Sequence, residues 1–172
     1  MRGTEGAEPI SMTSQSQIIC SRESGGCFAK GTLVRTPRGM FPIEVLVAGE
    51  EVITHDSRIA RIHKAHVASS SELVRITFSD RTSVVSTPWH RFFELRGSLI
   101  KADQLIVGTY VRNFDYSIAQ VLRVDKIAQG VANDVFNLSL ERDVGFYANG
   151  KLVEAPHAAR VLDTRSLLTR AS

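Results

Sequence analysis

The chain has 172 residues, of which 43% are hydrophobic and 23% charged, and a net charge of +3. These values are typical of one globular domain with a core. No apolar run approaches the roughly 20 residues of a membrane-spanning helix, and the first residues lack the pattern of a signal peptide. Basic residues are interleaved with acids, and Cys20 and Cys27 are too few for a disulfide framework. Composition therefore excludes collagen-like, membrane-spanning and small disulfide-rich classes, and we expect no nucleic-acid partner.

Residues 1–25 are polar and irregular, which predicts a tail or a junction to an upstream module. From Cys27 onward, short segments of alternating polarity are separated by turn residues. This pattern predicts many short strands and an all-β domain. The predicted strands span residues 32–36, 41–46, 51–54, 58–62, 72–78, 83–86, 92–95, 109–113, 120–124, 135–140 and 145–148.

Two segments depart from this strand pattern. Residues 100–105 predict one short turn of helix before Gly108, and residues 157–170 place apolar side chains on one stripe. We therefore expect a terminal amphipathic helix packed on the domain. The predicted organisation is a tail over 1–25, a domain over 26–155, and a helix or tail over 156–172, in a monomeric protein.

Cys27 opens the β-rich region directly after Gly25 and Gly26. A thiol is a strong nucleophile near neutral pH, and this one lies one peptide bond from the carbonyl of Gly26. Intramolecular attack would convert the Gly26–Cys27 amide into a thioester without elaborate substrate binding. Glycine suits the position before such a bond because it has no Cβ to crowd the sulfur.

A purely structural role for the cysteines is the alternative. A single cysteine is more often a small buried apolar side chain, and this reading applies to Cys20 as well. Cys20 and Cys27 could also pair when oxidised, which would block the nucleophile.

A thioester is less stable than an amide, so the departing nitrogen needs a proton. The segment 86–90 places Thr87 and His90 three residues apart around Pro88. Histidine suits proton transfer at physiological pH, and the threonine hydroxyl could orient the imidazole or hold the carbonyl. A histidine beside Trp89 and Phe92 is more often a structural residue.

Five segments in this order resemble the Hint family, the autoprocessing fold shared by Hedgehog C-terminal domains and inteins. The first three are residues 26–34, 38–44 and 49–52. The fourth is the Thr-x-x-His of 87–90 followed by 101–108, and the fifth is the pair of closing strands over 135–138 and 146–153. The resemblance implies a compact horseshoe of short strands. It also implies that Cys27 is the acyl-shift nucleophile and that Thr87 and His90 assist it.

Departures from the family pattern limit the chemistry that this resemblance implies. Val153 is followed by Glu154 and Ala155 where splicing inteins carry His-Asn, and alanine cannot cyclise, so we expect no splicing. Val144 and Asn137 stand where many inteins carry a His and an Asp. Asn137 could hydrogen-bond near Cys27 but could not act as an acid or base. His66 is a further supporting candidate, near the position where Hedgehog relatives place an Asp.

The sequence thus predicts a bacterial intein-like domain that cleaves itself once at Gly26–Cys27. Its substrate would be its own N-terminal flanking segment, and the acyl acceptor water, a thiol or an amine. We expect no cofactor. We also expect no metal, because His63 and His66 would point to opposite faces of a strand. Two alternatives are a catalytically silent Hint-like module and a Cys–His hydrolase acting on other chains. The compartment stays open between the cytoplasm and export within a larger protein.

Overall fold

The computed structural model describes residue 20 and residues 25–127, 130–142 and 144–156. Its elements are short strands with two single-turn 3-10 helices, and none of the described helices has the length or apolarity to cross a membrane. The elements are β1 Phe28–Ala29, β2 Leu33–Thr36, β3 Gly39–Pro42, η1 Ile43–Val45, β4 Glu51–Ile53, β5 Ile59–Ser70, β6 Leu73–Phe78, β7 Ser83–Ser86, β8 Arg91–Phe93, β9 Leu99–Lys101, η2 Ala102–Gln104, β10 Tyr110–Arg112, β11 Ile118–Ile127, β12 Asn133–Leu140, β13 Gly145–Ala148 and β14 Lys151–Glu154.

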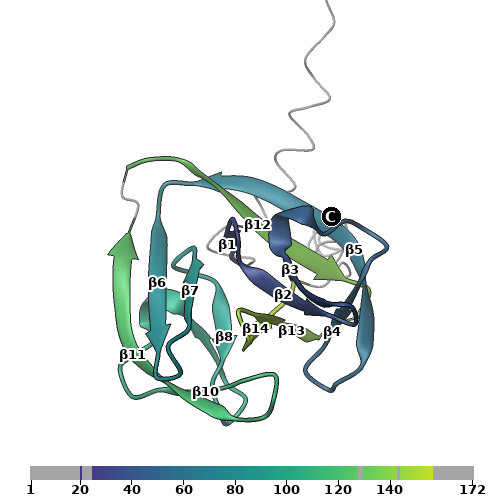
Figure 1. Ribbon diagram of the computed structural model, residues 1–172. Helices are drawn as coiled ribbons and strands as arrows, with labels where there is room; N and C mark the ends of the chain where they lie inside the picture. The colour runs from purple at the N-terminus through teal and green to yellow at the C-terminus, as the bar shows by residue number, and fades with distance from the viewer. Residues whose placement is uncertain (1–19, 21–24, 128–129, 143, 157–172) are drawn as a thin grey trace, which may run out of the picture.

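Within the described residues the strands form two sheets. The larger has the order β10-β11-β6-β7-β1-β12-β5-β4, and the smaller has the order β3-β2-β13-β14-β8-β9. The long strands β5, β6, β11 and β12 curve around the shorter ones, and β1 lies near the middle (Figure 1). The all-β prediction is confirmed, and the strand that follows Cys27 occupies an interior position of the larger sheet.

Most predicted strands are present; β1, β9 and β14 are additional, β11 is longer than expected, and two further differences have a clear physical reason. The strand expected over 41–46 ends at Pro42, and Ile43–Val45 form a 3-10 turn, because proline lacks the N–H that would continue the ladder. The strand expected over 58–62 continues to Ser70, because β5 pairs with β4 and then with β12 along its length. The short helical turn near residue 102 is confirmed. The helix expected over 157–170 lies outside the described residues.

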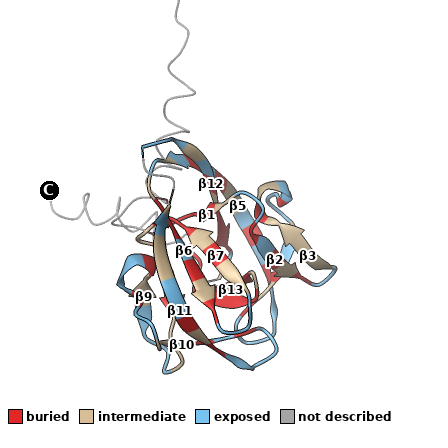
Figure 2. Ribbon diagram, turned by 60° about the vertical axis from the view of Figure 1, so that its left-hand side comes forward, coloured by how far each residue is buried: buried red, intermediate tan, exposed pale blue. Residues whose placement is uncertain are grey.

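Two apolar clusters lie on opposite faces of β12. Leu138 and Leu140 belong to the main core, whereas Val135 belongs to a smaller cluster with Cys20, Cys27, Ala68 and Leu73. This division follows from the alternation of side chains along a strand. Figure 2 shows that buried residues concentrate on the central strands, and all four residues of β13 are buried. Cys27 therefore lies on the side of the sheet that carries the smaller cluster.

Candidate functional site

Cys27 lies immediately before β1, between two neighbouring strands. Phe28 pairs with Ser86 of β7 on one side and with Phe136 of β12 on the other. The antiparallel registers therefore place Thr87 and Asn137 on either side of Cys27. Cys27, Thr87 and Asn137 are each no more than 1% exposed, so all three residues lie away from bulk water.

The Gly26–Cys27 peptide is held by side chains from both neighbouring strands. The Cys27 N–H donates to Thr87 Oγ1 at 3.0 Å, and the Thr87 N–H donates back to the Cys27 carbonyl at 2.9 Å. On the other side, Asn137 Nδ2 donates a short hydrogen bond to the Gly26 carbonyl oxygen. Both polar atoms of this one peptide bond are thus bound by buried side chains.

His90 packs directly against Gly26. A Cβ atom placed on Gly26 would lie 2.5 Å from both Cα and Cβ of His90, which no real side chain tolerates. The imidazole is 1% exposed, with its centroid 4.0 Å from the ring of Phe28 and 5.9 Å from that of Phe92. The absence of a side chain at Gly26 is what lets the histidine backbone approach the peptide this closely.

The surroundings of His90 keep its ring uncharged at neutral pH. Burial lowers its pKa to about 4, although interactions with the backbone of Gly26 and Glu154 partly oppose that shift. Among the described residues neither ring nitrogen has a hydrogen-bond partner of good geometry. A neutral imidazole with an unengaged nitrogen can accept a proton and pass it on.

His66 continues the polar row on the far side of Asn137. Its strand β5 pairs with β12 so that His66 lies directly opposite Asn137, and such partners point to the same face. His66 is 3% exposed, and its Nε2 lies 2.7 Å from Ser139 Oγ. Burial, with added repulsion from Lys64 and His63, lowers its pKa to about 4. Asn137 separates this histidine from the Gly26–Cys27 peptide.

In this structure Cys27 forms a disulfide with Cys20, with the two Cα atoms 5.1 Å apart. Trp89 Nε1 donates to the Cys20 carbonyl at 2.6 Å, so the loop between Thr87 and His90 also contacts Cys20. The pairing that the sequence left open is therefore present.

The described residues contain no cluster of three or more side chains suited to a metal ion. His63 is exposed whereas His66 is buried, which places the two on opposite faces of β5.

Sequence reasoning missed three contributors to this site: Ser139, Trp89 and the backbone of Glu154. Ser139 follows Asn137 by two residues, so strand alternation alone would have placed it on the same face. Trp89 and Glu154 act through partners far away in the chain, and no local pattern indicates such contacts.

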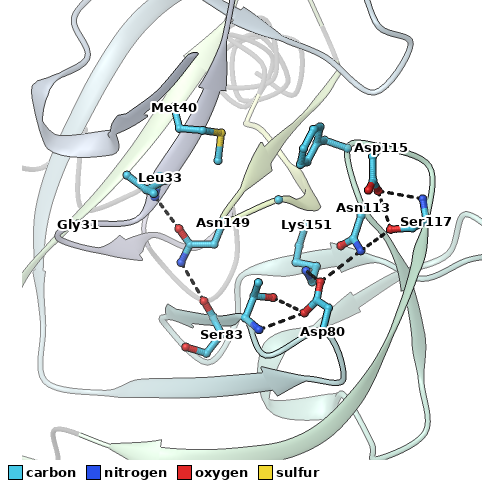
Figure 3. A pocket seen from close by; sticks show the side chains of 13 residues that line it. Gly31, Leu33, Met40, Asp80, Ser83, Asn113, Asp115, Ser117, Asn149 and Lys151 are labelled. Atoms are coloured by element: carbon cyan, nitrogen blue, oxygen red, sulfur yellow. Dashed lines mark hydrogen bonds and ion pairs between the residues drawn. The ribbon is translucent and has the colours of Figure 1, made fainter.

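Apart from this site, a cavity of about 650 Å³ lies beside the turn between β13 and β14 (Figure 3). Lys151 is 1% exposed there, and its Nζ lies 2.7 Å from Asp80 Oδ2. Burial opposes ionisation of Asp80, but hydrogen bonds from Lys151 and Thr82 outweigh it and lower its pKa to about 2. None of Gly26, Cys27 and His90 lines this cavity. Its ion pair joins Asp80, in the turn between β6 and β7, to Lys151 at the start of β14.

Comparisons with known proteins agree with this architecture. Residues 26–82 match the family model described as Hint domain. No match to a curated protein was found.

Solved structures are similar over most of the chain. A bacterial intein-like domain from Clostridium thermocellum is 21% identical, with a TM-score of 0.68 over 74% of this chain and 97% of that one. The gp41-1 intein is 20% identical, with a TM-score of 0.67 over 76% and 99%. The MchDnaB-1 intein is 18% identical, with a TM-score of 0.63 over 74% and 98%. At these identities the likeness concerns the fold.

Proposed function

We propose, from the premise that this chain carries a Hint domain, that it breaks its own Gly26–Cys27 bond by an N–S acyl shift. The observation that carries the proposal is the convergence of three residues on one peptide bond. Asn137 binds the carbonyl oxygen, Thr87 binds the amide N–H, and His90 packs against Gly26. A purely structural cysteine has no need for such an arrangement.

In the first step the reduced Cys27 sulfur attacks the carbonyl carbon of Gly26. The carbonyl oxygen gains negative charge, which the Asn137 amide stabilises through the hydrogen bond that already exists. The thiol proton passes to the neutral imidazole of His90. Because donor and nucleophile are already in place, little reorganisation is needed during the reaction.

In the second step the bond between the Gly26 carbonyl carbon and the Cys27 nitrogen breaks. His90 returns its proton to that nitrogen, while Thr87 Oγ1 holds the N–H already present. The products are a thioester between Gly26 and the Cys27 sulfur and a free amine on Cys27. Water, a thiol or an amine then takes the acyl group and releases the N-terminal segment.

The residues at the end of β14 support cleavage on the N-terminal side alone. β14 ends at Glu154, whose carboxylate pairs with Arg91 at 3.3 Å, and Ala155 follows as a buried residue. Neither side chain has the amide that cyclisation requires. We therefore propose N-terminal self-cleavage without splicing.

Mass spectrometry of the full chain tests the proposal. The protein is incubated with a phosphine reductant, with and without hydroxylamine, and the same is done with Cys27→Ala. We expect fragments 1–26 and 27–172 from the unsubstituted chain, with a hydroxamate on Gly26 when hydroxylamine is present, and no fragments from the variant. An intact chain with a reduced and alkylatable Cys27 would instead indicate a silent module, and cleavage of an added protein would indicate a hydrolase acting in trans.

A further inference from the structure

We propose that the Cys20–Cys27 disulfide is a redox gate on this reaction, opened by a thiol that attacks the sulfur of Cys20. This inference rests on the proposed function, because the gate controls the nucleophile that the acyl shift requires. It assigns Cys20 a role of its own as the site where a reductant acts.

The oxidised state blocks the acyl shift at its first atom. The nucleophile in such chemistry is a thiolate, and a sulfur already bonded to another sulfur cannot attack an amide carbonyl. Cys27 Sγ is bonded to Cys20, while Asn137 and Thr87 already hold the Gly26–Cys27 peptide. The peptide bond is therefore already held by both side chains while the sulfur of Cys27 is still oxidised.

Contacts beyond the disulfide hold Cys20 in place. Trp89 Nε1 donates to its carbonyl oxygen at 2.6 Å, and its side chain belongs to the apolar cluster with Leu73 and Val135. Trp89 stands between Thr87 and His90 in the chain. The loop that carries both assisting residues thus also fixes the cysteine that restrains the nucleophile.

Exposure makes the two sulfurs unequal as targets. Cys27 is 0% exposed and Cys20 is 6% exposed. A cavity of about 310 Å³ lies beside this region and is lined by Leu73, which shares an apolar cluster with Cys20, and by Trp89, which donates to the Cys20 carbonyl. Cys20 is therefore the less covered of the two residues, and we expect a small thiol to attack its sulfur in preference to that of Cys27.

The exchange balances as an ordinary thiol–disulfide reaction. A thiolate of the reductant, a low-molecular-weight or protein dithiol, attacks Cys20 Sγ and the Cys20–Cys27 bond breaks, so that Cys27 leaves as a thiolate. The second thiol of the reductant then releases Cys20 and closes the reductant's own disulfide. Two electrons pass from the dithiol, and its two protons end on Cys20 and Cys27. The leaving sulfur is the one that the acyl shift uses.

The gate would couple self-cleavage to the redox state of the surroundings. Disulfides persist in oxidising compartments and are reduced in the cytosol. The chain would remain intact in the former and cleave after entering the latter. Cleavage before reduction is excluded, because the sulfur of an oxidised Cys27 is not free to attack the carbonyl.

The test compares the oxidised full chain with Cys20→Ser, each incubated with and without a phosphine, which reduces disulfides but does not itself intercept thioesters as a thiol does. We expect the unsubstituted chain to cleave only after reduction and Cys20→Ser to cleave in both conditions. A second measurement adds limiting glutathione, quenches with acid and N-ethylmaleimide, and maps the adducts. Glutathione is expected on Cys20 and maleimide on Cys27.

Cleavage of the oxidised chain at the rate of the reduced one would overturn the gate, and so would a non-reducing peptide map without the 20–27 link. Glutathione found on Cys27 would overturn the direction of attack. If reduced chain and Cys20→Ser both stay intact with Cys27 alkylatable, the proposed self-cleavage fails, while the adduct map still decides which sulfur the reductant attacks.

Discussion

The side-chain amide of Asn137 binds the carbonyl oxygen of Gly26, 111 residues earlier in the chain. The two residues meet because β12 pairs with β1 through Phe136 and Phe28. A hydrogen-bond donor at this oxygen stabilises negative charge that forms only when the carbonyl is attacked. The strand register therefore supplies the electrostatic part of the proposed chemistry.

Replacing Asn137 with alanine removes that donor and leaves the strand in place. We expect Asn137→Ala to slow self-cleavage by about 100-fold or more, the usual cost of one oxyanion donor. The rate is measured from fragment masses over time in reduced protein. Asn133→Ala is the matched control, because Asn133 lies on the same strand and its side-chain amide donates to the Val131 carbonyl, not to the Gly26–Cys27 peptide. Equal rates in both variants would exclude the oxyanion role.

Gly26→Ala tests the close packing of His90 on the scissile bond. The added Cβ would lie 2.5 Å from the Cα and Cβ atoms of His90, and backbone atoms cannot rotate away. We expect a loss of about 1–3 kcal/mol in the free energy of unfolding together with much slower cleavage, because the imidazole is displaced.

Gly31→Ala separates the loss of stability from the loss of activity. A Cβ at Gly31 meets no atom within 4 Å, but its φ of +87° is strained for alanine. We expect a cost of about 1 kcal/mol and an unchanged cleavage rate. Slowing of both variants to the same degree would contradict the role assigned to His90 packing.

The two buried histidines predict how stability depends on pH. In the unfolded chain they titrate near 6.5, whereas burial lowers the pKa of both His66 and His90 to about 4. Between these values the unfolded state binds more protons, so acidification favours unfolding. The free energy of unfolding should be fully maintained above pH 6.5 and fall toward pH 4 by up to about 1.4 kcal/mol per pH unit for each histidine.

Urea unfolding at several pH values measures this dependence. His66→Gln should make the slope between pH 6.5 and 4 shallower, because the titrating imidazole is replaced by an amide that does not titrate. His63→Gln is the control, since His63 is exposed on the other face of β5. An unchanged slope in His66→Gln would show that this residue does not carry the effect.

The ion pair between Lys151 and Asp80 predicts that replacing one partner costs more stability than replacing the other. Lys151 is 1% exposed in its side chain and Asp80 is 31% exposed. Asp80→Asn leaves a buried ammonium without its counter-ion and should lower the free energy of unfolding by about 3 kcal/mol. Lys151→Met leaves a carboxylate that water can reach, so its cost should be smaller. Arg123→Met, in the exposed pair with Asp125, should change stability by less than about 1 kcal/mol.

Much of the fold was predictable from local pattern. Alternating segments and turn residues located most strands, because each strand buries one face and exposes the other. The end of β3 at Pro42 and the full length of β5 were mispredicted. The first depends on a missing N–H, and the second on pairing with β12, a partner more than 60 residues away in the sequence.

The site was only partly predictable from its residues. Gly26, Cys27, Thr87, His90, Asn137 and His66 were named from chemistry and resemblance, and the sheet registers bring the first five together around one peptide bond. The contacts of Ser139 with His66 and of Trp89 with Cys20 depend on tertiary packing. No local pattern indicates that Lys151 is buried, because its partner Asp80 lies 71 residues earlier in the chain.

The hydrogen bond between the Cys27 N–H and Thr87 Oγ1 also governs what happens after the bond breaks. In the proposed reaction the new amine stays anchored between β7 and β12, within reach of the acyl carbon it has just left. The nitrogen can recapture that carbon and restore the original backbone. Release of the upstream segment then depends on a kinetic competition. Acyl transfer to an external acceptor must be faster than return of the acyl group to the Cys27 nitrogen.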